Sequence, residues 1–91
     1  MDRTQLESQL IEAFDAEPAA ARIVARQASD LADSAQYADD FEGPLTVEIV
    51  LDNLDDAPAE SDLIERWNWW LGALELSHGG YQRFRVRPDV V

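Results

Sequence analysis

Cysteine and lysine are both absent from the 91-residue sequence. Without cysteine the chain has no disulfide, no thiolate zinc site and no cysteine nucleophile. It also lacks a glycine-rich phosphate loop, a dinucleotide fingerprint, a His-Glu-x-x-His motif and a Gly-x-Ser-x-Gly elbow. No residue is therefore singled out for catalysis, cofactor binding or metal binding, and we predict a protein that is not an enzyme.

Long apolar runs are absent as well, and the first residues, from Met1 to Thr4, form neither a basic nor an apolar region. A secretory signal needs both regions, and a membrane-spanning helix needs about 20 apolar residues. We therefore expect a cytoplasmic protein without a membrane span. The 91 residues, 46% of them hydrophobic, suffice for one small core, so we predict a single domain over residues 1–91.

Acidic residues outnumber basic ones by 19 to 7, and the formal net charge is -12. This charge repels phosphate backbones, so nucleic acid is not an expected partner. The acid-rich, lysine-free composition resembles that of cytosolic proteins from halophilic archaea, which implies adaptation to molar salt. At such salt the Debye length is only about 3 Å, and carboxylate repulsion is largely screened. An acidic protein from a GC-rich organism is the alternative interpretation.

The N-terminal part, residues 4–40, has the pattern of a helical pair. Thr4 and Glu7 form a capping-box pattern ahead of apolar residues at helical spacing, which predicts a helix over residues 4–15. Pro18 suits the first turn of a second helix, and no glycine or further proline interrupts the chain up to residue 40. Small apolar residues along this second helix would let the pair pack closely.

The C-terminal part, residues 44–88, has the pattern of a strand-helix-strand unit. Residues 45–51 and 81–87 alternate between apolar and polar, and residues 59–77 between them have helical spacing. A helix of this length carries the chain back along a strand, which favours a parallel βαβ topology. The predicted fold class is α+β, with a small two-stranded sheet packed by helices and extended by dimerisation.

The strongest local feature is the run Trp67-Asn68-Trp69-Trp70 in the predicted third helix. Three tryptophans in four positions exceed what one helix face needs for packing on a small sheet. We expect Trp67 and Trp70 in the core. Tryptophan is common in interface hot spots, so we predict an interface at the side of this helix. Its residues are Trp69, Arg66, Ala73 and Leu76.

Three arginines, Arg83, Arg85 and Arg87, alternate with apolar residues in the predicted second strand. Such a ridge in a basic protein would suggest phosphate binding. Glu48 on the polar face of the neighbouring predicted strand offers another role, because opposite charges pair across strands. We favour an ion-pair ridge, within the chain or between subunits, over a nucleic-acid site.

The single histidine, His78, precedes Gly79-Gly80 at the end of the predicted helix, where its side chain suits the helix dipole. We interpret it as a cap. A small enzyme assembled across a dimer cleft is a third hypothesis, with His78 as its one candidate residue. Asp52, Asp55 and Asp56 do not fit a calcium loop, so we expect a solvated acidic turn there.

The sequence does not specify a function. The favoured hypothesis is a small non-enzymatic protein-interaction or assembly module that forms a homodimer or binds another protein. The alternative is a regulatory protein associated with nucleic acid through Arg83, Arg85 and Arg87. No specific small-molecule ligand is predicted.

Overall fold

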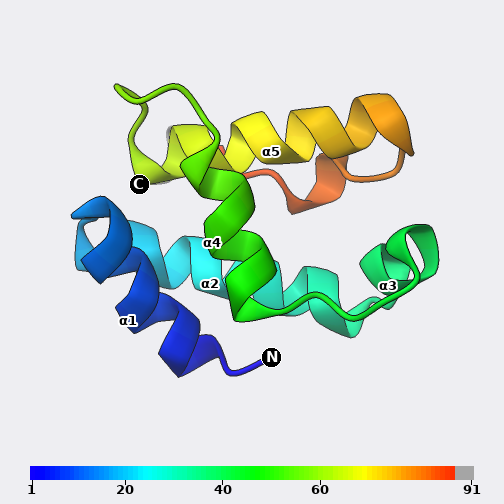
Figure 1. The fold of residues 1–91 in the computed structure, drawn as a ribbon, viewed down its shortest axis with the longest axis horizontal. Coiled ribbons are helices and arrows are strands. Elements are labelled where there is room, and N and C mark those ends of the chain that lie inside the picture. Colours follow the sequence, from blue (N-terminus) through cyan, green and yellow to red (C-terminus); the bar gives the residue numbers. More distant parts are fainter. Residues whose placement is uncertain (88–91) are drawn as a thin grey trace.

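The structure is a computed structural model that describes residues 1–87. Within this range the chain forms five α-helices, one short 3-10 helix and no strand (Figure 1). The predicted α+β class, with its two-stranded sheet, is therefore wrong. The elements are α1 (Arg3–Phe14), α2 (Pro18–Asp33), α3 (Gln36–Phe41), α4 (Val47–Asp55), α5 (Leu63–Ser77) and η1 (Gln82–Phe84).

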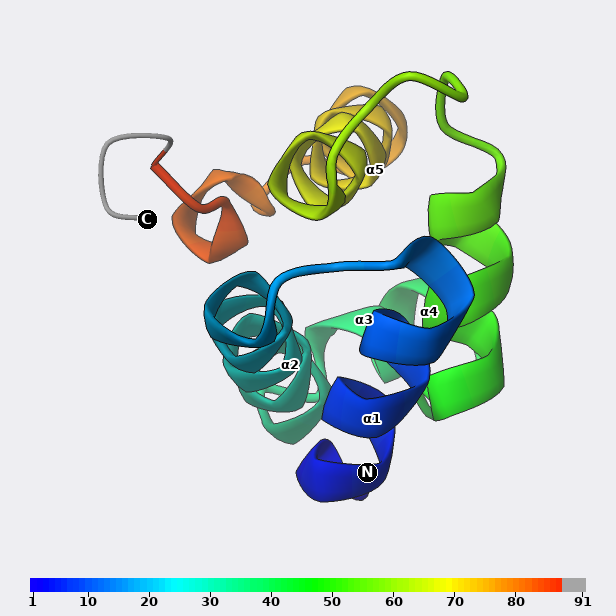
Figure 2. The same cartoon turned by 90° about the vertical axis from the view of Figure 1, so that its left-hand side faces the viewer.

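The helices surround one hydrophobic core. Helix α1 packs against α2 and α4, and α5 packs against α2 and α4 from the other side (Figures 1 and 2). The residues around η1 lie beside both α5 and α2. The largest fully buried side chains come from four of the helices and from the segment after α5: Trp67, Tyr81, Leu6, Leu10, Leu31, Leu54, Leu71, Val24 and Val50.

The predicted N-terminal helices are present, but their ends differ from the prediction. Helix α1 is capped by Asp2, whose carboxylate accepts a hydrogen bond from the Gln5 amide, and Thr4 is not the cap. Helix α2 begins at Pro18 and ends at Asp33 rather than at residue 40. The Ser34 hydroxyl donates to the Leu31 carbonyl, and Ala35 adopts a φ of 63°. This left-handed residue separates α2 from α3.

Residues 45–51, predicted to be a strand, contribute most of helix α4. Thr46 begins it, since the Thr46 hydroxyl accepts a hydrogen bond from the Ile49 amide. Val50 and Leu54, four residues apart, are fully buried on one side of α4. Alternation and helical spacing overlap in this short apolar run, and the Thr46 cap and the core contacts favour the helix.

The second predicted strand, residues 81–87, is a single turn of 3-10 helix followed by extended chain, with no strand beside it within residues 1–87. We call residues 81–87 the C-terminal segment. Phe84 and Val86 are buried as the alternation implies, and Tyr81 is buried too. Pro88, the predicted end of this strand, lies outside the described residues.

Thr4, the predicted cap of the first helix, and Thr46, the observed cap of α4, allow a test of the observed helix starts. We expect Thr46→Ala to lower the free energy of unfolding by about 1 kcal/mol, because α4 loses its cap. Thr4→Ala is the matched control and should change it by less than about 0.5 kcal/mol, because Thr4 is exposed and caps nothing. Urea unfolding measures both. Equal effects of the two substitutions would contradict the observed helix starts.

Candidate functional site

Helix α5 directs the four side chains of the tryptophan-rich run in different directions. Trp67 and Trp70 point into the core, as predicted, where they are 0% and 4% exposed. Their rings meet edge to face at 5.6 Å, and Trp70 meets Tyr37 in the same way at 6.2 Å. Trp69 remains 42% exposed on the opposite side. The run therefore supplies both the core of the protein and part of its surface.

Trp67 and Asn68 bind the backbone of the C-terminal segment. The Trp67 indole nitrogen donates a 2.8 Å hydrogen bond to the Phe84 carbonyl. The Asn68 amide donates to the Val86 carbonyl at 2.7 Å and accepts from the Val86 amide at 2.8 Å. Asn68 therefore pairs with both backbone groups of Val86, as a neighbouring strand would. Sequence reasoning missed this role, although a polar residue between two core tryptophans was a signal.

Glu75 holds the beginning of the same segment. Its carboxylate accepts hydrogen bonds of 3.0 Å from the backbone amides of Gly80, Tyr81 and Gln82. The chain reaches this position through Gly79 and Gly80, whose φ angles of 77° and 85° favour glycine. One side of α5 thus binds the C-terminal segment through Trp67, Asn68 and Glu75.

Helix α3 holds the segment from the other side. The Tyr81 hydroxyl donates a 2.7 Å hydrogen bond to the Asp40 carboxylate, and the Gln36 amide donates to the Gly80 carbonyl at 2.9 Å. Burial and the bond to Asp40 raise the pKa of the Tyr81 phenol well above its usual value. The segment is therefore fixed between α5 and α3.

The three arginines of the predicted ridge lie around one surface cavity. Arg83, Arg85 and Arg87 are exposed and line a cavity of about 410 Å³, together with residues that include Asn68. Arg83 donates to the Gln36 side chain at 2.8 Å, and Arg85 donates to Gln82 at 3.1 Å. Glu48 lies elsewhere, on α4. Because neither predicted strand exists, the cross-strand pairing of Glu48 with these arginines has lost its structural basis.

Three of the four predicted interface residues lie together on the outside of α5. Leu76 is 91% exposed, and Ala73 and Trp69 are exposed one and two turns before it. We call Trp69, Gly72, Ala73 and Leu76 the outer face of α5. Gly72, which sequence reasoning missed, has no heavy atom within 4 Å of the position that a Cβ would occupy.

Arg66, the fourth predicted interface residue, binds the loop before α5 instead. Its guanidinium donates hydrogen bonds to the carbonyls of Ser61, Leu54 and Ala59 at 3.0 to 3.2 Å. It also lies over the Phe14 ring, 4.9 Å from its centre. Arg66 therefore stabilises the connection between α4 and α5.

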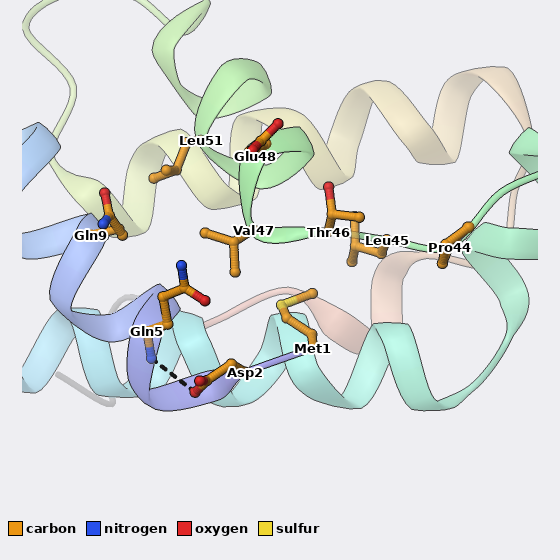
Figure 3. A pocket seen from close by; sticks show the side chains of 10 residues that line it. All are labelled: Met1, Asp2, Gln5, Gln9, Pro44, Leu45, Thr46, Val47, Glu48 and Leu51. Atoms are coloured by element: carbon orange, nitrogen blue, oxygen red, sulfur yellow. Dashed lines mark hydrogen bonds between the residues drawn. The ribbon is translucent and has the colours of Figure 1, made fainter.

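A second cavity, of about 670 Å³, lies between α1 and the beginning of α4 (Figure 3). Apolar side chains from Val47 and Leu51 face polar ones from Gln5 and Gln9 across it. Sequence reasoning missed this cavity, because it depends on residues 47–55 being helical. It is lined by Met1, Asp2, Gln5, Gln9, Pro44, Leu45, Thr46, Val47, Glu48 and Leu51.

His78 is the C-cap residue of α5, but it caps the helix through its backbone amide, which donates to the Leu74 carbonyl, and not through the side chain as predicted. Its Nδ1 lies 2.9 Å from the Ser77 hydroxyl, and its ring lies 4.5 Å from that of Phe41. The acidic residues Asp52 and Asp55 belong to α4 rather than to a turn. Within residues 1–87, no group of three or more histidine and acidic side chains is placed to hold a metal ion. No helix in that range is long and apolar enough to cross a membrane.

Comparison with known proteins gives one match. The family model of the WNWW domain matches residues 1–75, a range that contains Trp67-Asn68-Trp69-Trp70. The C-terminal segment that Trp67 and Asn68 bind lies beyond the matched range. No curated protein and no solved structure matches the chain.

The pairing of Asn68 with Val86 leads to a stability prediction. In Asn68→Asp the carboxylate can no longer donate to the Val86 carbonyl, so two acceptors face each other. We expect the free energy of unfolding to fall by about 1 to 3 kcal/mol. The matched control Gln5→Glu adds the same charge at an exposed position and should change it by less than about 0.5 kcal/mol. Equal unfolding midpoints for the two variants would refute the pairing.

The buried phenol of Tyr81 leads to a pH prediction. The pKa of Tyr81 is raised by folding, so its contribution to stability is full below the ordinary tyrosine pKa of about 10 and is lost as the pH rises above it. The pKa of Tyr37 is raised by burial and acts in the same direction. We expect unfolding free energy to decrease above pH 10, and to decrease less steeply in Tyr81→Phe. Identical slopes for wild type and variant would argue against this environment.

Proposed function

This chain belongs to the WNWW domain family, and we propose that it is a small non-enzymatic protein-interaction module of the cytoplasm whose binding surface is the outer face of α5. Leu76, 91% exposed, is the observation that carries this proposal. Burying a leucine side chain fully is worth about 1.5 to 3 kcal/mol, and here the gain is left for a partner. Trp69 adds a large aromatic side chain on the same face two turns earlier, of the kind that dominates binding energy in interfaces.

The charge distribution supports the same surface. The chain has a net charge of -12, yet Trp69, Gly72, Ala73 and Leu76 are all uncharged. Glu75, the one charged residue between Trp69 and the end of α5, turns its carboxylate to the C-terminal segment. A partner could therefore cover the outer face without burying an unpaired carboxylate.

The rigid attachment of α5 to the rest of the chain also supports a binding role. Trp67 and Trp70 anchor the helix in the core, and Asn68 and Glu75 join it to the C-terminal segment. Trp69 and Leu76 are therefore presented on a rigid element, which lowers the entropy lost on binding.

The alternative is association with nucleic acid through the C-terminal segment, favoured by the gathering of Arg83, Arg85 and Arg87 around one cavity. It requires RNA or DNA binding that is lost when these arginines are replaced. The outer face of α5 is the stronger candidate, because the net charge of -12 opposes a phosphate backbone. The compositional resemblance to halophilic proteins places the function of either surface at high salt.

Site-specific photo-crosslinking tests the interaction module. A benzophenone amino acid replaces Leu76 or, as the control, the exposed Ala13 on α1, and each chain is irradiated in an extract of its source cells at molar salt. We expect an adduct from position 76 that position 13 does not give. Excess unmodified chain should suppress an adduct with another protein, or should itself enter the adduct if the partner is a second copy, whereas excess Trp69→Asp chain should do neither. The same adducts from both positions would refute the outer face as the binding surface.

A further inference from the structure

We infer that the partner on the outer face of α5 is a second copy of this chain, and that the two α5 helices pack antiparallel about a twofold axis at Gly72 and Ala73. The inference rests on the proposed function, because it names the occupant of the same surface. In Figure 2 helices α1 to α4 lie below α5, and the exposure of Trp69, Ala73 and Leu76 shows that no part of residues 1–87 covers the outer face.

The arrangement of large and small residues is self-complementary. Trp69 and Leu76 are the large side chains, and Gly72 and Ala73 lie midway between them. A twofold axis through this midpoint places Trp69 opposite Leu76 of the partner subunit, and places the two small residues at the crossing. A dimer with twofold symmetry requires such a surface, because one patch has to fit itself.

Gly72 is explained by this contact and by nothing within residues 1–87. A Cβ at this position would meet no heavy atom within 4 Å, so the fold of the single chain does not require glycine there. Glycine inside a helix costs about 0.5 to 1 kcal/mol relative to alanine. At a helix crossing the missing side chain permits a short interaxial distance, near the lower end of the usual range of about 8 to 10 Å.

The charges at the ends of α5 favour antiparallel over parallel packing of the two helices. The first turn of α5 and its N-cap are acidic, with Glu65 and Asp62, whereas residues 76–80 at its other end include no acidic residue. A parallel pair would bring the acidic ends of both helices together, which a chain of net charge -12 cannot easily balance. An antiparallel pair keeps the two acidic ends apart, at opposite ends of the contact, and brings each one beside the end of the other helix that has no acidic residue. The remaining repulsion between copies is screened in molar salt.

The absence of cysteine makes disulfide trapping a direct test. Residues near the axis come within bridging distance, with Cα atoms about 4.4 to 6.8 Å apart, so Ala73→Cys should form a disulfide dimer under mild oxidation in molar potassium chloride. The two copies of residue 76 are then about 10 Å apart along the helices, so Leu76→Cys should not. Ala13→Cys, on the exposed side of α1, is the control for random collision.

Light scattering in molar potassium chloride supplies the second measurement. The wild-type chain should have twice the molar mass of one copy. Gly72→Leu should be monomeric, and at protein concentrations low enough for the wild type to dissociate it should melt no lower than the wild type, since its side chain meets only open space in the single chain. A monomeric wild type with no Ala73→Cys dimer would overturn the second copy as partner. Rapid Leu76→Cys dimerisation would instead overturn the antiparallel direction.

These outcomes separate the two proposals. If the purified chain is monomeric but benzophenone at position 76 still gives its specific adduct in the extract, the self-association is wrong and the interaction module stands. If position 76 gives no specific adduct and the chain is monomeric, both proposals fail. A dimer trapped through Ala73→Cys, with the Ala13→Cys control unlinked, supports both.

Discussion

The rest of the structure depends on the hydrogen bonds from α5 to the backbone of the C-terminal segment. Buried backbone groups need partners, and residues 81–87 have no neighbouring strand to supply them. Trp67 and Asn68 take that role for Phe84 and Val86. The apolar side chains of the segment can then be buried against α5 and α2 without leaving their amides and carbonyls unpaired.

This contact also decides which side of α5 is free. Trp67 and Trp70 occupy the side toward the core, Asn68 and Glu75 the side toward the C-terminal segment, and Arg66 the side toward the loop after α4. What is left is the outer face. One tryptophan-rich run thus contributes to the core, binds the C-terminal segment and exposes Trp69, and these roles require helical spacing within a single element.

Helical periodicity was predictable from the sequence, whereas the two strands were not correctly predicted. Pro18 correctly marked the start of α2, and the end predicted for the third helix at residue 77 is that of α5, although α2 ends at Asp33 rather than at residue 40 and α5 begins at Leu63 rather than at residue 59. Residues 45–51 are too short and too apolar to distinguish a strand from a helix, and Thr46 as a cap was the overlooked signal. The alternation in residues 81–87 correctly marked Phe84 and Val86 as inward, but burial of alternate residues does not require a partner strand.

The residues of the candidate site were also predictable only in part. Trp69, Ala73 and Leu76 share a face because of helical spacing alone, so sequence reasoning could group them. Arg66 has the same spacing, but its guanidinium binds backbone carbonyls around the loop before α5 and does not join the outer face. The path of that loop could not be predicted from a local sequence pattern. Gly72 differs from Arg66, because no contact within residues 1–87 requires glycine at its position. A glycine that costs helix stability and meets no neighbour among residues 1–87 is best explained by a contact with another molecule.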